Sequence, residues 1–298
     1  MSETDRDSRA GGTENLLKKM IVEESERLGS DDSFRFGCHP GVSCFNTCCG
    51  DVNIFLSPYD VLRMKKRLGL TSSEFLEKYT MLPLHKDITT PVVLMRMNED
   101  EARSCPFLGE EGCGIYTDRP WPCRMYPLGL AVARDTPDGW RGERFYFLLK
   151  EEECLGFNEE KEWTVREWLE DQGVEEYDIW GEAFKELTLN PFFEEGNTLT
   201  PEKMEMFYTA TYDLDKFREF VFESTLLDRF EVDEDLVEEM RADDEALLRF
   251  GFLWLQFSLF GEPTMKVRQD VAEAFQGKLD KRNLKKTDSV AAPEKDTQ

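Results

Sequence analysis

The chain has 298 residues, of which 40% are hydrophobic and 12% aromatic, enough apolar material to bury a core, and this excludes a disordered protein. The formal net charge is −25, and the excess lies in the second half: residues 36–150 hold 14 acidic and 14 basic side chains, whereas residues 151–250 hold 32 acidic and 9 basic ones, a net charge of −23. A surface this negative repels phosphates, so we expect neither nucleic acid nor an anionic membrane as a partner.

The acidic second half has two interpretations. It is either a device for solubility or a contact face for a basic protein partner. The beginning of the chain, Met1 to Asn15, has no basic start followed by an apolar run and a small-residue cleavage site, so we expect a cytoplasmic protein. The most apolar stretch, residues 250–260, is about half as long as a membrane-spanning helix and predicts a buried helix instead.

Four regions follow one another along the chain. Residues 1–30 form a polar tail with a helix expected over 14–27, and a Lys-rich tail covers 277–298; both are typical of mobile termini. Residues 36–157 form a segment that is interrupted by Gly and Pro and contains every cysteine. Residues 164–275 form an acidic region with long amphipathic patterns. We therefore predict an α+β fold, in which an irregular cysteine-rich metal-binding domain precedes a mostly helical region.

Short regular elements are predicted within the cysteine segment. Ser57 is a hydroxyl N-cap before Pro58, with Asp60 at the third helical position, and Gly69 closes the helix. The stretch 71–74 (TSSE) repeats this capping pattern and begins a second helix. Two runs of β-branched and aromatic residues, 92–97 and 145–149, have the length of strands and predict a small sheet.

The region after residue 164 shows helix starts and apolar stripes. Thr164 with Glu167 forms a capping box, Thr200 precedes Pro201, and Asp243 begins an acidic first turn. Apolar residues at helical spacing mark two further helices: Tyr177, Trp180, Phe184 and Leu187, then Leu214, Phe217 and Val221.

The cysteines carry the strongest chemical signal in the sequence. There are eight, all within fewer than 120 residues: Cys38, Cys44, Cys48, Cys49, Cys105, Cys113, Cys123 and Cys154. Disulfides do not suit a reducing compartment, and buried structural thiols would not cluster with a doublet. A catalytic thiol needs a nearby base, and the chain has only His39 and His85, which we interpret as loop residues. Metal ligation by all eight is the favoured interpretation.

The spacing of the cysteines adds detail. If residues 44–49 are helical, Cys44 and Cys48 face the same side, whereas Cys49 is turned by about 100° and serves another edge of a large cluster or another centre. Gly and Pro flank the later cysteines, as close-approach ligand loops require, and Arg119 and Arg124 can offset thiolate charge.

The identity of the metal stays open between zinc and iron. Zinc knuckles commonly use Cys-x2-Cys hairpins, and the sequence has no pair at that spacing. Eight soft ligands with almost no histidine favour an iron-sulfur cluster over zinc. Neither a ferredoxin-type run of four cysteines nor a Gly-rich nucleotide-binding motif is present in the sequence.

Three ordered blocks resemble the YkgJ-type cysteine-cluster family, which is described as chelating zinc or iron. The first is FGCHPGVSCFNTCCGDVNIFLSPYDVLRMKKRLGLTSSEFLEKY, the second SCPFLGEEGCGIYTDRPWPCRMYPL and the third ECLGF, which ends the set with Cys154. The opening spacing, Cys-x5-Cys-x3-Cys-Cys, is wider than the usual family form, and this affects the match of Cys38 most. The resemblance covers about 120 residues and implies metal binding without naming a reaction.

Three functions are compatible with that resemblance. A redox or electron-transfer protein would use a reducible, partly accessible centre. A metal-stabilised interaction module would use the acidic helical region as its contact face. Some related cysteine-cluster proteins are iron-sulfur-dependent protein lysine methylases, so a similar enzyme is the third alternative, although the radical-type Cys-x3-Cys-x2-Cys arrangement is not found in this sequence.

Overall fold

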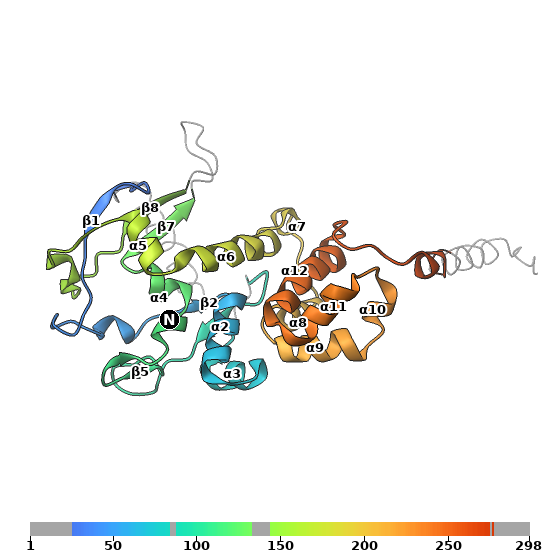
Figure 1. The fold of residues 1–298 in the computed structure, drawn as a ribbon, viewed down its shortest axis with the longest axis horizontal. Helices are drawn as coiled ribbons and strands as arrows, with labels where there is room; N and C mark the ends of the chain where they lie inside the picture. Colours follow the sequence, from blue (N-terminus) through green and yellow to red (C-terminus); the bar gives the residue numbers. More distant parts are fainter. Residues whose placement is uncertain (1–25, 84–87, 133–143, 275, 277–298) are drawn as a thin grey trace, which may run out of the picture. The chain divides into compact units, whose positions relative to one another are not determined.

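The computed structural model describes residues 26–83, 88–132, 144–274 and 276. The chain divides into two compact units (Figure 1): unit 1 comprises Met1–Leu70, Glu77–Leu84 and Val92–Glu182, and unit 2 comprises Thr71–Leu76, His85–Pro91 and Ala183–Gln298. Most of the predicted N-terminal tail and its helix, the tail from residue 277 and His85 lie outside the described residues. The predicted boundaries at 36–157 and 164–275 stay a prediction.

The predicted α+β class is confirmed by small antiparallel sheets and many helices. In unit 1, β1 (Ser33–Arg35) pairs with β9 (Glu162–Thr164), and β7 (Leu128–Val132) pairs with β8 (Arg144–Leu148). The strands β2 (Phe55–Leu56), β4 (Val93–Met95) and β3 (Thr80–Met81) form a three-stranded sheet, and β5 (Leu108–Gly109) pairs with β6 (Gly112–Cys113). The two strands predicted from sequence correspond to β4 and β8, which belong to different sheets.

The first predicted helix of unit 1 forms as its capping residues dictate. It is α2 (Pro58–Leu68), and a complete capping box joins Ser57 to Asp60. Gly69 ends it with φ 66°, a left-handed conformation that glycine adopts without steric cost. The predicted box at Thr71 and Glu74 also forms and begins α3 (Ser72–Tyr79), which starts in unit 2 and ends in unit 1.

Three more helices belong wholly or in part to unit 1. They are α4 (Trp121–Met125), α5 (Val165–Asp171), and α6 (Val174–Thr188), which continues into unit 2. The predicted capping box of Thr164 and Glu167 is confirmed at the start of α5.

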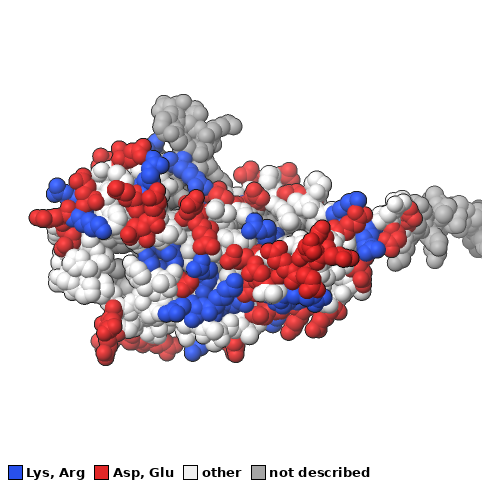
Figure 2. Space-filling view, viewed as in Figure 1, with Lys and Arg blue, Asp and Glu red and all other residues white. Residues whose placement is uncertain are grey.

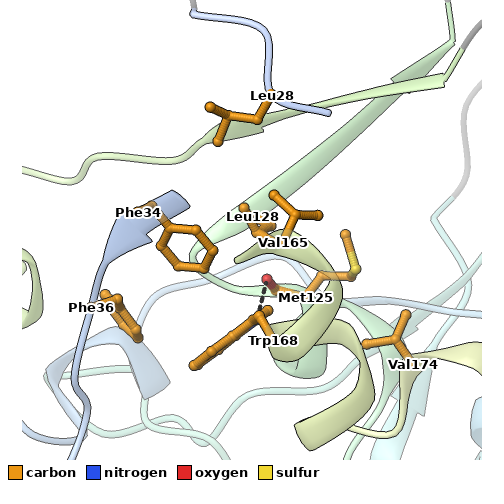
Figure 3. Packing of buried hydrophobic residues seen from close by; sticks show 8 residues of the cluster. All are labelled: Leu28, Phe34, Phe36, Met125, Leu128, Val165, Trp168 and Val174. Carbon is orange, nitrogen blue, oxygen red and sulfur yellow. Dashed lines mark hydrogen bonds between the residues drawn. The ribbon is translucent and has the colours of Figure 1, made fainter. Parts of the chain in front are cut away.

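One hydrophobic cluster of unit 1 lies between the paired strands and α4 and α5 (Figure 3). Eight residues make up its buried cluster: Leu28, Phe34, Phe36, Met125, Leu128, Val165, Trp168 and Val174. The Trp168 Nε1–H donates to the Met125 carbonyl at 3.3 Å, and the Phe36 and Trp168 rings meet edge to face with centroids 5.5 Å apart. Cys154 packs against this cluster, so the core directly supports one of the thiols.

Asp60 connects two helices of unit 1 although its side chain is fully buried. One carboxylate oxygen, Oδ2, accepts from Ser57 N–H and Ser57 Oγ–H, each at 2.7 Å. The other, Oδ1, accepts from Trp121 N–H at 2.7 Å, at the start of α4. Burial raises the pKa of Asp60, and these hydrogen bonds oppose that rise. The carboxylate therefore caps α2 and fixes α4 at the same time.

Unit 2 is helical in the residues that the structure describes from Ala183 onward, as predicted. Its helices are α7 (Pro191–Glu194), α8 (Pro201–Thr211), α9 (Leu214–Glu223), α10 (Leu226–Arg229), α11 (Glu234–Ala242) and α12 (Asp244–Phe260). Thr200 and Asp243 cap α8 and α12 through their side chains, as expected. The helix predicted over residues 250–260 is confirmed within α12, and most of it is buried. A side chain at Gly251 would meet the Ala210 carbonyl, so a small residue allows α8 and α12 to approach.

The surface of the helical region carries the predicted negative charge. Figure 2 shows acidic side chains distributed over the face in view, with Lys and Arg side chains between them. In α11, for example, Glu234, Asp235 and Glu238 are exposed. Within the described residues, none of the helices combines the length and the apolar composition that crossing a bilayer would require.

The Asp60→Asn substitution tests the role of the buried carboxylate. The amide of asparagine offers only one acceptor oxygen. Whichever way the amide is oriented, one of the two backbone donors, Ser57 N–H or Trp121 N–H, loses its partner. We expect the free energy of unfolding of unit 1 to fall by about 1–3 kcal/mol, the cost of one unsatisfied buried donor, measured by urea denaturation.

Glu167→Gln is the matched control, because it changes the same atom in the exposed capping box of α5. Its effect should be clearly smaller. Equal losses for the two variants would show that the contact between Asp60 and Trp121 contributes nothing beyond an ordinary helix cap.

Candidate metal centre

The eight cysteines come from five separate stretches of unit 1. Cys38 and Cys44 lie in the loop after β1, and Cys48 and Cys49 lie in a 3₁₀ turn, Thr47–Cys49. Cys105 precedes β5, Cys113 ends β6, Cys123 lies in α4, and Cys154 precedes a second 3₁₀ turn, Leu155–Asn158. The hypothesis that residues 44–49 form a helix is wrong. Asn46 has φ 70°, a left-handed conformation that interrupts a helix before the 3₁₀ turn. Long-range contacts, rather than helical spacing, determine which thiols are neighbours.

One set of thiols surrounds the segment that carries the last cysteine. Leu155 N–H donates to the Cys44 Sγ at 3.2 Å, and Gly37 N–H donates to the Gly156 carbonyl at 3.0 Å. The pKa of the Cys38 thiol is raised to about 11, first by burial and then by the charges of its neighbours Cys48, Cys44 and Cys154. We call this set the outer group, because two of its members are exposed: Cys38, Cys44, Cys48 and Cys154.

A second set of thiols surrounds the β5–β6 hairpin. Cys105 N–H donates to the Cys49 carbonyl at 2.7 Å, and the hairpin register pairs Leu108 with Cys113. The pKa of Cys123 is raised to about 12 by burial and by the charges of Cys105 and Cys113. We call this set the inner group, none of whose members is exposed: Cys49, Cys105, Cys113 and Cys123.

The doublet divides between the two groups. A hydrogen bond between the two side chains lowers the pKa of Cys48 to about 7 and raises that of Cys49. The charge of Cys48 also raises the pKa of Cys38, whereas the charges of Cys123 and Cys105 raise the pKa of Cys49. The two thiols therefore contact each other, and their other charge interactions involve different cysteines.

The two arginines proposed to offset thiolate charge have different positions. Both are buried, so neither is an ordinary surface residue. Arg119 lies over the Tyr116 ring at 3.8 Å, and its positive charge opposes the rise that burial and the neighbouring charges produce in the pKa of Cys123. Its positive charge can therefore offset thiolate charge in the inner group, as expected from the sequence.

Arg124 has a structural role instead. Its guanidinium donates to the carbonyl oxygens of Arg119 at 2.9 Å and Gln172 at 2.7 Å, to the Thr117 carbonyl, and to the Tyr177 hydroxyl at 3.0 Å. These bonds join the loop after Cys113 to α4 and to the link between α5 and α6. They fix the backbone on both sides of Cys123.

Tyr126 is a residue of this site that sequence reasoning missed. Among the described residues, its hydroxyl oxygen is a buried side-chain polar atom to which no N or O partner is bonded. Burial raises the pKa of Tyr126, and the adjacent Cys154 thiol raises it further. The phenol therefore keeps its proton beside the outer group, where it could donate to a thiolate. Its position immediately before Pro127 and one turn after Cys123 gave no signal of this role.

His39 is occupied by other partners. Its Nδ1 accepts from Gly41 N–H at 3.1 Å, and its Nε2 lies 3.2 Å from a Glu159 carboxylate oxygen. The ring is about half exposed. These contacts agree with its interpretation as a loop residue and leave the thiols as the soft donors of the site.

The donor set fits a thiolate-bound metal, although the side chains do not form a closed site. Over the described ranges, no three Cys, His, Asp or Glu side chains lie close enough together to hold a metal ion. The chemistry nevertheless matches: soft sulfur donors, a backbone N–H directed at Cys44 Sγ, and a buried hydroxyl beside Cys154. Metal binding would require the thiols of a group to draw together.

A comparison with family models identifies this segment. Residues 37–162 match the model of a domain described as putative zinc- or iron-chelating, and the matched span contains all eight cysteines. The resemblance seen in the sequence is thereby confirmed over these residues. No curated protein and no solved structure matches the chain. The family supports metal binding by unit 1 without distinguishing zinc from iron.

Tyr126→Phe and Tyr177→Phe form a matched pair of substitutions. The Tyr126 hydroxyl is buried without an N or O partner, so its removal should not lower the stability of the metal-free protein in urea denaturation. Metal retention against a chelator should fall, because the donor beside Cys154 is lost. Tyr177→Phe removes an acceptor of Arg124 and should lower stability instead. A loss of metal-free stability in Tyr126→Phe as large as in Tyr177→Phe would contradict the proposed role of the Tyr126 hydroxyl.

Proposed function

We propose that unit 1 binds iron-sulfur clusters through its eight cysteine thiolates and that the chain is a redox or electron-transfer protein. The observation that carries the proposal is the convergence of thiols from five stretches of chain into two neighbouring sets. The family match supports a metal, and the composition of the donor set favours an iron-sulfur cluster over zinc. Iron-sulfur clusters are held by thiolates, whereas many zinc sites also use histidine.

The surroundings of the thiols also favour a cluster. Hydrogen bonds to sulfur tune the potential of iron-sulfur centres, and the Leu155 N–H and the Tyr126 hydroxyl are donors of this kind. Arg119 reduces the cost of negative charge near Cys123. A bound cluster would supply the ability to accept and release an electron. The protein residues hold it, shield its inner side and leave Cys38 and Cys48 near solvent.

This accessibility is the reason for preferring electron transfer to a purely structural role. A structural zinc site is closed by its four ligands and gains little from solvent exposure. An electron-transfer centre needs one edge close to the surface so that a partner can approach. The exposed Cys38 and Cys48 would provide that edge.

Anaerobic purification of the full chain, expressed with ample iron, tests the proposal. We expect bound iron with a similar amount of acid-labile sulfide, and a visible absorption that dithionite bleaches and oxidation restores. The same protein after chelation is the control and should lose this absorption. Zinc without sulfide would refute the iron-sulfur assignment, and a cluster that cannot be reduced reversibly would refute the redox role.

A further inference from the structure

Unit 2 contains a groove that takes no part in the candidate metal centre. It lies between α10, the beginning of α11 and residues 268–273, and its volume is about 780 Å³. Four apolar side chains line it, and all are only partly buried, so each presents apolar surface to the groove. They are Leu227, Phe230, Val232 and Val237. Accessible apolar surface within a concavity is typical of a binding site.

The walls of the groove are held in place by contacts within unit 2. Glu231 N–H donates to the Lys266 carbonyl at 2.8 Å, and Phe230 pairs with Val267 in an antiparallel bridge. The Phe230 ring also meets the Phe257 ring of α12 edge to face, with centroids 5.3 Å apart. These contacts fix the segment that leads into residues 268–273 against the helices, so the fold itself maintains the concave shape.

The charge that lines the groove is negative. Four carboxylates and one guanidinium contribute to the lining, and all five residues are exposed: Glu231, Glu234, Asp270 and Glu273, with Arg268. Glu231 pairs with Lys266 at 2.5 Å, and Asp270 lies 3.8 Å from Arg268. Glu273 accepts from the Gln269 amide at 2.9 Å, which leaves its charge uncompensated. Within the part of the chain that the structure describes, neither Glu234 nor Glu273 pairs with a cation, so both carboxylates are available to a positively charged ligand.

This combination of apolar surface and negative charge suits one class of ligand best. Phosphates and acidic peptides would be repelled by the carboxylates. Small-molecule sites usually enclose their ligand, whereas the charged walls of this groove are exposed. A polyamine would pair with the carboxylates and leave the apolar side chains unused. A basic amphipathic helix satisfies both features, because its apolar side chains at positions i, i+3, i+4 and i+7 share one face that Lys or Arg residues flank.

We propose that this groove binds a basic amphipathic helix of a partner protein. The apolar face of that helix contacts Leu227 and Val237, and its Lys or Arg side chains pair with Glu234 and Glu273. The surface belongs to unit 2, so the proposal goes beyond the function proposed for unit 1 and does not depend on a metal. Exposed ion pairs contribute little each and weaken with salt. The apolar contacts therefore supply most of the affinity, and the carboxylates select a basic partner.

Fluorescence anisotropy with a synthetic peptide tests the proposal on the full chain. The probe is a labelled helix-forming peptide of about 14 residues, with Leu at positions i, i+3, i+4 and i+7 and Lys elsewhere. Wild type should bind this peptide, and the binding should weaken but persist as salt is raised. A second peptide, in which Gln replaces every Leu, should not bind measurably, because it cannot use the apolar surface of the groove.

Variants of the protein locate the binding. Glu234→Gln/Glu273→Gln should weaken it about tenfold. Glu219→Gln/Glu223→Gln is the matched control, because it removes the same charge from exposed positions of α9 outside the groove, and it should change the affinity less than about twofold. Val237→Thr keeps the shape of the side chain but adds a hydroxyl, and it should weaken binding by about threefold or more. Far-ultraviolet circular dichroism identifies variants that retain the fold.

Several results would overturn the proposal. They are the absence of binding by wild type, equal weakening by the two double variants, and equal affinity for the Leu and Gln peptides. If spermine displaces the Leu peptide without any dependence on Val237, the ligand is a polyamine instead. A carbodiimide cross-link between Glu234 or Glu273 and a lysine of residues 277–298 would assign the groove to the Lys-rich end of the chain itself and would exclude a separate partner. If Glu234→Gln disturbs the start of α11, Glu273→Gln alone should still weaken binding, by about threefold.

Discussion

The arrangement of the inner thiols depends on a buried guanidinium. Arg124 follows Cys123 directly, and its hydrogen bonds reach the carbonyl oxygens of Arg119 and Gln172, as well as the Tyr177 hydroxyl. A buried cation is expensive unless its donors are satisfied, and the planar fork of arginine can satisfy several acceptors at once. Leaving any of these donors or acceptors unpaired would cost free energy. The bonds therefore fix the loop after Cys113, α4 and the start of α6 in one arrangement. Cys123 is thereby placed beside the hairpin that carries Cys105 and Cys113.

The outer thiols depend on a different support, the aromatic core of unit 1. Phe36 packs against Trp168 and Phe157, and Cys154 contacts the same cluster. This packing brings the loop after β1 to the segment after β8, which are more than 100 residues apart in sequence. Loop-closure entropy opposes such long-range contacts, and burial of the aromatic rings compensates for it. The two groups thus rest on separate interactions, an arginine network for the inner one and ring packing for the outer one.

Sequence reasoning succeeded where structure is determined locally. The capping boxes at Ser57 and Thr164 involve residues three apart, so their chemistry can be read directly from the sequence, as can the concentration of cysteines. It could not determine which thiols are neighbours, because the bond between Cys105 and Cys49 spans 56 positions and the turn at Asn46 replaces the helix considered there. The burial of the Tyr126 hydroxyl could not be predicted either, because it results from tertiary packing and not from the local sequence. Cys38, the weakest match to the family spacing, lies with the outer group all the same. The proposals for a protein partner and for the metal ligands remain predictions.

X-ray absorption spectroscopy of the loaded protein at the metal edge tests the central claim, that cysteine thiolates hold the metal. The account predicts a first coordination shell of sulfur alone, because His39 is engaged by Gly41 and Glu159, and Asp60, whose charge acts on Cys123, is committed to Ser57 and Trp121. The His39→Ala variant should give the same spectrum as wild type. Nitrogen or oxygen scatterers in the first shell of wild type, lost in His39→Ala or retained in it, would contradict a site built from the eight cysteines.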